Sequence, residues 1–135
     1  MARYLLDTNI LIAAIKGVSA VRSRLAQLDA ADLVLSPVVL GELMVGVEKS
    51  RLKESNRAVL QGLMTSFECA PLDQLTAQRY GQVRAQLESE GRTIGGNDYW
   101  IAAQALTLDL TLVTDNTREF ERVAGLKLEN WLRPD

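Results

Sequence analysis

Two short apolar segments, far apart in the chain, end in the same pattern of polar residues. Tyr4-Leu5-Leu6 is followed by Asp7-Thr8-Asn9, and Thr111-Leu112-Val113 is followed by Thr114-Asp115-Asn116. In open α/β sheets, ligands bind beyond the carboxyl ends of the strands, so side chains that follow a strand face that crevice rather than the core. The two endings therefore predict a polar site at one edge of a parallel sheet.

Short apolar segments alternate with helical patterns along the whole chain. We expect strands at 4–6, 32–36, 67–72, 111–113 and 126–128, and helices at 10–15, 19–28, 37–47, 53–65, 74–90, 99–108 and 118–123. This order predicts an α/β fold, a three-layer α/β/α arrangement with a mostly parallel central sheet and right-handed crossovers. The length of 135 residues suits one ordinary domain, so we expect a single domain over residues 1–135.

Two further acids stand in unusually apolar surroundings. Glu42 is the only charged residue of segment 37–47, and burying a lone carboxylate is costly unless it is paired or binds a metal. Asp98 follows a Gly-Gly-Asn turn and precedes residues 99–108, which contain no Lys, Arg, Asp or Glu and predict a largely buried helix. With the acids at the two strand ends, they predict one metal site.

Each acid also has an ordinary structural explanation. Asp7 could cap a helix, and Asp98 could complement a helix dipole from the first turn. Glu42 could pair with a distant Arg or Lys, and Asp115 with Asn116 could form a turn. Only the presence of all four acids together favours a metal-binding catalytic site.

The chain contains no histidine and a single cysteine, Cys69. The lack of histidine excludes the imidazole-dependent serine and cysteine triads and the usual zinc ligands. A site rich in carboxylates favours Mg²⁺ or Mn²⁺, which prefer oxygen ligands and can activate water for phosphodiester hydrolysis. Cys69 lies in an apolar segment that predicts a core strand, so we expect it to have an inert packing role.

Charge and hydropathy restrict the cellular location and the binding partners that the sequence predicts. No apolar run approaches the roughly 20 residues of a membrane-spanning helix, and no signal peptide is visible, so we expect a cytoplasmic protein without a membrane partner. The net charge of −2 excludes a broadly basic nucleic-acid binder. Local groups of Lys and Arg fit solvated helical faces better than phosphate sites. Arg92, Arg118 and Arg122 are of more interest because they lie close in sequence to Asp98 and Asp115.

Together these motifs resemble one family, the PIN-domain ribonucleases, and specifically the VapC-type toxins of toxin–antitoxin pairs. The matching segments are residues 5–9, the helix around Glu42, residues 94–103 and residues 112–120. Their order and spacing extend over almost the whole chain, so the resemblance is specific even though each motif alone is weak.

The resemblance implies a set of site residues and partners. The catalytic, metal-holding acids would be Asp7, Glu42 and Asp98. The supporting polar groups would be Thr8, Asn9 and Thr114. It also implies Mg²⁺ or Mn²⁺ dependence, endonucleolytic cleavage of RNA, a homodimer, and inhibition by a VapB-like antitoxin. Residues 80–103 look most like the branch that cleaves initiator tRNA in its anticodon loop.

The fourth acid departs from the family pattern. Many PIN domains have Asp two residues after the strand-ending Thr, where this chain has Asn116. Asp115 precedes that position and Glu119 follows it. We favour Glu119 over Asp115 as the fourth catalytic acid, and Asn116 could ligate through its amide oxygen.

Two other functions compete with the nuclease. In an aspartyl-phosphate enzyme Asp7 would accept a phosphoryl group, but the haloacid dehalogenase pattern requires a second Asp where this chain has Asn9. A non-catalytic PIN-like scaffold would bind only RNA or protein. The intact set of Asp7, Glu42 and Asp98 argues against such a scaffold.

Overall fold

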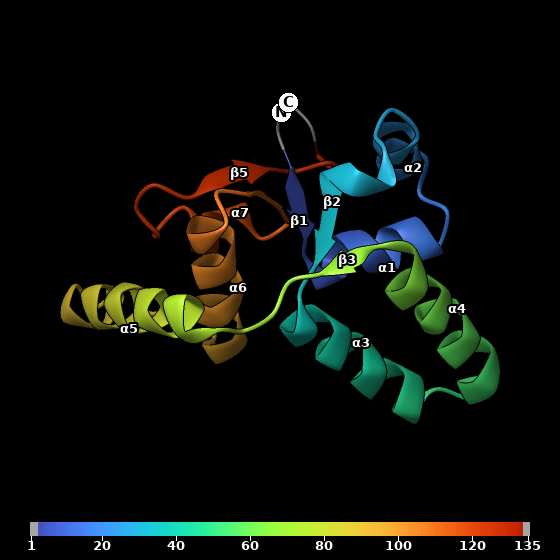
Figure 1. The fold of residues 1–135 in the computed structure, drawn as a ribbon, viewed down its shortest axis with the longest axis horizontal. Coiled ribbons are helices and arrows are strands. Elements are labelled where there is room, and N and C mark those ends of the chain that lie inside the picture. The colour runs from blue at the N-terminus through green and yellow to red at the C-terminus, as the bar shows by residue number, and fades with distance from the viewer. Residues whose placement is uncertain (1–2, 134–135) are drawn as a thin grey trace.

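Five strands form one parallel sheet in the computed structural model, which describes residues 3–133 (Figure 1). The strands are β1 (Tyr4–Leu6), β2 (Leu33–Leu35), β3 (Glu68–Cys69), β4 (Thr111–Val113) and β5 (Lys127–Glu129). Their order across the sheet is β3-β2-β1-β4-β5, and all neighbouring strands run parallel. The prediction of a mostly parallel sheet is confirmed.

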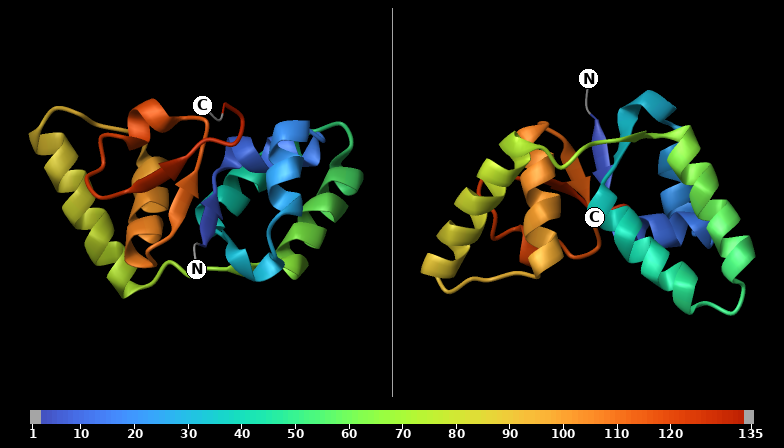
Figure 2. Two further views of the ribbon diagram at one scale, coloured as in Figure 1. Left: turned by 90° about the horizontal axis from the view of Figure 1, so that it is seen from above. Right: turned by 60° about the horizontal axis from the view of Figure 1, so that its bottom comes forward.

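Helices cover both faces of this sheet. Within residues 3–133 the α-helices are α1 (Thr8–Ile15), α2 (Ser19–Ala26), α3 (Pro37–Lys49), α4 (Lys53–Ser66), α5 (Gln74–Ser89), α6 (Gly96–Thr107) and α7 (Thr117–Phe120). Figures 1 and 2 show α3 and α4 on one side of the strands and α5 and α6 on the other. The expected three-layer α/β/α arrangement is confirmed. Among the helices of residues 3–133, none combines the length and the hydropathy that a membrane-spanning segment requires.

Two of the helices that lead away from the sheet begin at caps encoded in the sequence. Asp7 precedes α1, and its side chain accepts a hydrogen bond from the Thr8 N–H at 2.8 Å. Ser36 caps α3 by accepting from the Val38 N–H at 3.2 Å, and Pro37 occupies the first turn, where its missing N–H costs nothing. The caps fix where each helix leaves its strand, and so place Asp7 and the Glu42 helix at the same sheet edge.

The middle of the sheet is buried and its two edges are not. All residues of β1, β2 and β4 are buried, as expected for strands covered by helices on both faces. Beyond β5, the buried Trp131 packs edge-on against Tyr4 with 5.4 Å between ring centroids. Because β1 is the central strand, the residue that follows it lies at the centre of the carboxyl edge.

The expectation that Cys69 lies in a core strand is wrong. Cys69 belongs to β3, which contains only two residues, forms the edge of the sheet and is exposed. An edge strand has a neighbour on one side only, so an apolar segment there is not enclosed. Partial burial still raises the pKa of the Cys69 thiol, which disfavours the reactive thiolate at neutral pH.

Candidate active site

The two polar motifs meet where β1 and β4 end. The Asp7 N–H donates to the Val113 carbonyl at 2.9 Å, which continues the pairing of the two strands. The Thr114 hydroxyl donates to Asp7 Oδ2 at 2.7 Å. The Asp115 N–H donates to Asn9 Oδ1 at 3.0 Å. The structure therefore brings together the motifs that the sequence predicts to share one edge.

Asp7 is a buried carboxylate, with 5% of its surface exposed. Burial raises its pKa and the charge of Glu42 adds to this, whereas hydrogen bonds from Thr114, Thr8 and Asn9 lower it. Its role as cap of α1, one of the ordinary explanations, is confirmed. Capping does not exclude a role in metal binding. A buried carboxylate without a cationic partner costs free energy, and a bound cation would lower that cost.

Glu42 lies on α3 and is half-buried. The Thr8 hydroxyl donates to Glu42 Oε1 at 2.6 Å. None of the ion pairs within residues 3–133 involves Glu42, so a cationic partner does not account for this acid in the described chain. Together with residues 95–98, Glu42 lines an open hollow of about 430 Å³.

Asp98 stands in the first turn of α6 and lines the same hollow. Its pKa is raised to about 6, first by burial and then by the charges of Asp7, Glu119 and Glu42. Gly95 lies against it, since a Cβ at that position would stand 3.0 Å from Asp98 Oδ2. The negative charges of Asp7, Glu119 and Glu42 thus all disfavour the ionised form of Asp98.

The acids influence the pKa of Asp98, but they do not form a preformed metal-binding site in the described part of the chain. No three acidic or cysteine side chains in residues 3–133 converge closely enough to hold an ion among them. Mg²⁺ suits such an arrangement, because it commonly takes one or two carboxylates and completes its shell with waters and substrate phosphate oxygens. The donor set, carboxylates with hydroxyls and no histidine, is that of a hard divalent cation.

The structure separates the candidates for the fourth acid. Glu119 lies on α7, where it accepts a hydrogen bond from the Asn116 side-chain amide and raises the pKa of Asp98. Asn116 is thereby engaged as a donor to Glu119, and its own N–H donates to Thr114 Oγ1 at 3.0 Å. Of the three candidates, Glu119 is the one whose charge raises the pKa of Asp98.

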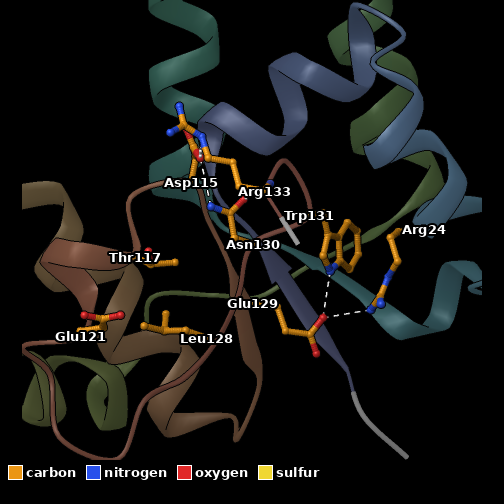
Figure 3. Close-up of a pocket in the computed structure, with 9 residues that line it drawn as sticks. All are labelled: Arg24, Asp115, Thr117, Glu121, Leu128, Glu129, Asn130, Trp131 and Arg133. Carbon is orange, nitrogen blue, oxygen red and sulfur yellow. Dashed lines mark hydrogen bonds and ion pairs between the residues drawn. The ribbon is translucent and has the colours of Figure 1, made fainter. Parts of the chain in front are cut away.

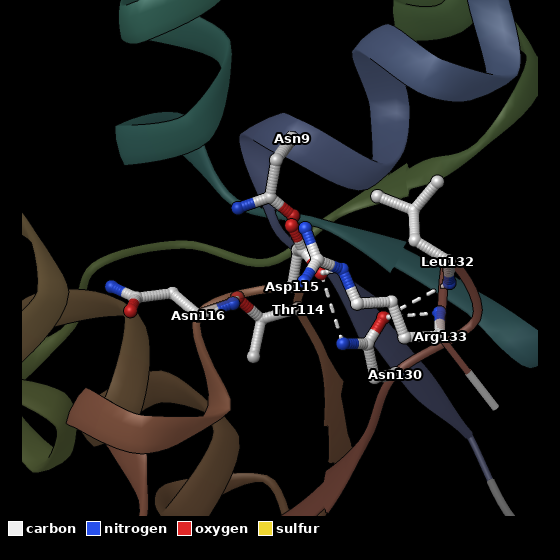
Figure 4. Close-up of polar contacts among 7 residues, drawn as sticks. All are labelled: Asn9, Thr114, Asp115, Asn116, Asn130, Leu132 and Arg133. Atoms are coloured by element: carbon white, nitrogen blue, oxygen red, sulfur yellow. Dashed lines mark hydrogen bonds and ion pairs between the residues drawn. The ribbon is translucent and has the colours of Figure 1, made fainter. Parts of the chain in front are cut away.

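Asp115 is held by the C-terminal segment instead (Figure 4). Its Oδ1 accepts from the Asn130 side-chain amide at 3.0 Å and pairs with Arg133 Nε at 3.2 Å. Asn130 in turn accepts hydrogen bonds from the Leu132 and Arg133 N–H groups at 2.9 and 3.1 Å. Asp115 therefore connects the C-terminal segment to Asn9, and its carboxylate is already paired.

A larger hollow, of about 760 Å³, lies on the Asp115 side of the sheet (Figure 3). Arg24 pairs with Glu129 at 2.9 Å, and its guanidinium lies 5.0 Å from the centre of the Trp131 ring. Trp131 Nε1 also donates to Glu129 at 2.9 Å. Arg24 and Glu129 neutralise each other in the wall of this hollow, and Asp115 is paired with Arg133. The smaller hollow instead carries Glu42 and Asp98, and neither of these acids has an ion-pair partner within residues 3–133.

Sequence reasoning missed a buried polar link beneath the site. Gln104 on α6 is fully buried and accepts a hydrogen bond from the Ser36 hydroxyl. Its amide nitrogen donates to the Ala70 carbonyl at 3.0 Å. This link joins the Asp98 helix to the start of the Glu42 helix. Its only signal in the sequence is a single amide in an otherwise apolar helical segment.

Comparison with known proteins decides the family. The family model described as the PIN domain matches residues 4–126. The chain belongs to the PIN-domain family. This PIN domain is 43% identical over 132 residues to the tRNA(fMet)-specific endonuclease VapC of Shigella flexneri, covering 97% of this chain and 99% of the relative. It is 39% identical over 133 residues to the ribonuclease VapC2 of Haemophilus influenzae, covering 98% of this chain and all of the relative (100%).

Solved structures support the same assignment. The DNA-bound VapBC structure from Salmonella typhimurium contains a chain 37% identical to this PIN domain, with a TM-score of 0.90, covering 97% of this chain and 99% of that chain. The VapBC2 structure from Rickettsia felis, bound to a DNA fragment from the promoter, contains a chain 39% identical to this PIN domain. The TM-score is 0.87, and the match covers 95% of this chain and 98% of that chain. Each of these two chains aligns with at least 95% of this chain.

Proposed function

We propose that this PIN domain is a divalent-metal-dependent endoribonuclease toxin that hydrolyses phosphodiester bonds in RNA. The observation that carries the proposal is the electrostatic coupling of Asp98 to Asp7, Glu119 and Glu42, none of which has an ion-pair partner within residues 3–133. Relatives named tRNA(fMet)-specific endonucleases favour initiator tRNA as the substrate of this chain. We also propose that the cut falls in the anticodon loop and that the protein acts in the cytoplasm.

The residues present suit Mg²⁺ or Mn²⁺, with Asp7 and Asp98 as the principal holders of the ion and Glu119 supporting them. When bound, such an ion activates water and neutralises charge on the scissile phosphate. Asp7 is fixed beforehand by Thr114 and by the cap of α1. Glu42, held by the Thr8 hydroxyl, would orient the attacking water and accept its proton.

The shape of the site suits a flexible RNA strand. The hollow between Glu42 and residues 95–98 is shallow and open to solvent, so an extended backbone can lay a phosphate into it. A paired RNA helix would present its phosphates less freely, whereas unpaired loops can be splayed out on a protein surface. The open site therefore supports the proposal that cleavage falls within a loop.

The direct test uses total bacterial RNA. The wild-type protein and the Asp7→Asn and Asp98→Asn variants are incubated with Mn²⁺ or EDTA, and new RNA ends are mapped by sequencing. We expect discrete cuts, with initiator tRNA among the substrates, that need both the metal and the acids. A folded wild-type protein that binds Mn²⁺ and makes no cuts would favour the non-catalytic scaffold over the nuclease.

Thr114 provides a second test, because its hydroxyl lowers the pKa of Asp7. In Thr114→Val the side chain keeps its shape but loses the donor, so the Asp7 pKa should rise further. We expect the acidic limb of the kcat/KM profile to move to higher pH, with a stability loss of about 1 kcal/mol. Thr114→Ser keeps the hydroxyl and should keep the wild-type profile. Identical profiles for the Val and Ser variants would contradict this role.

We further propose that an antitoxin segment of the VapB type docks on an apolar groove of about 530 Å³ between α1, α3 and α4. Ile12, Ile15 and Val59 line the groove and are each about two-fifths exposed, at 39%, 41% and 44%. The similarity to chains in VapBC structures supports this partner. Such a groove suits an amphipathic helix.

Ile15→Asp tests the antitoxin groove. A charge in its wall should weaken antitoxin binding at least about 10-fold in calorimetry, as loss of an interface anchor does, and leave RNA cleavage unchanged. Ile15→Leu should bind normally. Unaltered affinity of the Asp variant would place the antitoxin elsewhere.

We also propose that the protein forms a homodimer. A monomeric mass in sedimentation at micromolar concentration would refute this proposal.

A further inference from the structure

A second groove is linked to the acid site through two chain segments and carries the opposite charge. It has a volume of about 350 Å³ and lies between α5, the end of α6 and the segment that follows α7. We term it the basic groove, and its polar lining consists of six side chains: Arg79, Gln82, Gln86, Glu90, Arg92 and Arg122. Building on the proposed nuclease function, we infer that the basic groove binds the sugar-phosphate backbone of the RNA strand next to the scissile bond.

The charges of the basic groove are largely uncompensated. Three arginines face a single acid, Glu90. Glu90 accepts a hydrogen bond from Gln86 Nε2 at 2.6 Å and pairs only loosely with Arg92, at 3.8 Å. Arg79 is exposed and has neither an ion pair nor a side-chain hydrogen bond within residues 3–133. The wall therefore offers free guanidinium donors to a ligand.

The basic groove is joined to the acid site by two chain segments. Arg122 Nη1 donates to the Thr93 carbonyl at 2.7 Å. Thr93 belongs to the loop that runs from the end of α5 to the start of α6, where Asp98 stands, and Figure 2 shows this loop. Arg122 also follows Glu119 on the short segment after α7. A strand with one phosphate at the acids can thus continue over the loop into the groove.

Phosphate is the ligand that fits this combination best. The acid site repels a polyanion, and the net charge of −2 gives the chain no general attraction for RNA. Binding therefore needs local cations near the acids. Arginine forks match phosphate oxygens with paired donors, and the apolar floor formed by Val83, Leu87 and Val123 suits the sugar face.

The test compares two triple variants that remove equal charge. Arg79→Gln/Arg92→Gln/Arg122→Gln alters the basic groove, and Lys49→Gln/Arg51→Gln/Lys53→Gln alters three basic residues at the turn between α3 and α4. Binding of a fluorescein-labelled uridine oligonucleotide and of an initiator tRNA anticodon stem-loop is followed by anisotropy in EDTA, between about 50 and 200 mM salt. We expect the groove variant to bind at least about 10-fold more weakly, with a salt slope lower by about 2, since each single-strand phosphate contact contributes about 0.7. The control should change less than about 2-fold.

Cleavage kinetics with Mn²⁺ distinguish this inference from the nuclease proposal. The groove variant should show a raised KM and a nearly unchanged kcat, and Arg79→Gln alone should show part of the effect even if the triple variant folds poorly. Equal affinities and salt slopes for the two triple variants, or no salt-dependent RNA binding by the wild type, would overturn the inference. Wild-type protein that binds RNA through the groove but never cuts it would instead refute the nuclease.

Discussion

Asp98→Asn is expected to reduce metal-dependent RNA cleavage by at least about 100-fold and, at the same time, to stabilise the metal-free protein. The loss of activity follows because this carboxylate is proposed to hold the ion that neutralises the phosphate, and removal of one such electrostatic stabiliser commonly costs about 10²–10³ in rate. The gain in stability follows because burial and the charges of Asp7, Glu119 and Glu42 all oppose ionisation of Asp98.

The sign of the pH dependence follows from the raised pKa of Asp98. Its ordinary value of 3.8 applies to the unfolded chain and a value of about 6 to the folded chain. Between these two values the folded state binds more protons than the unfolded state, so stability falls as pH rises from about 4 to about 6 and stays lower above that range. The full shift corresponds to about 3 kcal/mol, which solvent screening of the half-buried side chain reduces to about 1–2 kcal/mol.

Urea unfolding at pH 4 and pH 7, with EDTA and with Mn²⁺, measures this effect. We expect wild type and Asp98→Asn to be nearly equal at pH 4 and the variant to be more stable at pH 7. Saturating Mn²⁺, at about 100 times its Kd, should stabilise the wild type by about 2.7 kcal/mol and so reverse the order at pH 7. Asp109→Asn, an exposed acid paired with Lys127, is the control and should show no metal-dependent reversal. A variant less stable than wild type at pH 7 in EDTA would contradict the proposed repulsion.

The layers and the acid-bearing elements could be predicted because their signals are local. Apolar runs of three residues between helical patterns mark the central strands, and caps such as Ser36 with Pro37 mark where a helix begins. The meeting of Asp7 and Thr114 could be predicted only as far as a common sheet edge. Their direct contact depends on the pairing of β1 with β4, and no local sequence pattern specifies which strands pair.

The features that sequence reasoning missed depend on distant parts of the chain. Cys69 lies in an apolar segment, yet it is exposed because β3 is placed at the edge of the sheet. Asp115 and Glu119 could not be separated by spacing, since what occupies Asp115 is Asn130 and Arg133 from the C-terminal segment. Such long-range partners have no local signature.

Gln104→Leu is expected to destabilise the protein by about 2–5 kcal/mol without touching any of the acids. Both Gln104 and Ser36 are fully buried, and the substitution leaves the Ser36 hydroxyl and the Ala70 carbonyl without this partner. Each buried group left unsatisfied costs about 1–3 kcal/mol. Since total stabilities are about 5–15 kcal/mol, the loss would be a large part of the whole.

A double-mutant cycle with Ser36→Ala isolates the Ser36–Gln104 hydrogen bond in urea unfolding. Ser36→Ala alone should cost about 2–4 kcal/mol, because it removes the cap of α3 at the Val38 N–H and leaves the buried Gln104 Oε1 without this donor. The double variant removes both partners, so its loss should fall short of the sum of the single losses by at least about 1 kcal/mol. Gln78→Leu on the exposed surface of α5 is the matched control and should stay within about 0.5 kcal/mol of wild type. Additive losses would show that Ser36 and Gln104 act independently, and the Glu42 and Asp98 helices would then owe their relative position to apolar packing alone.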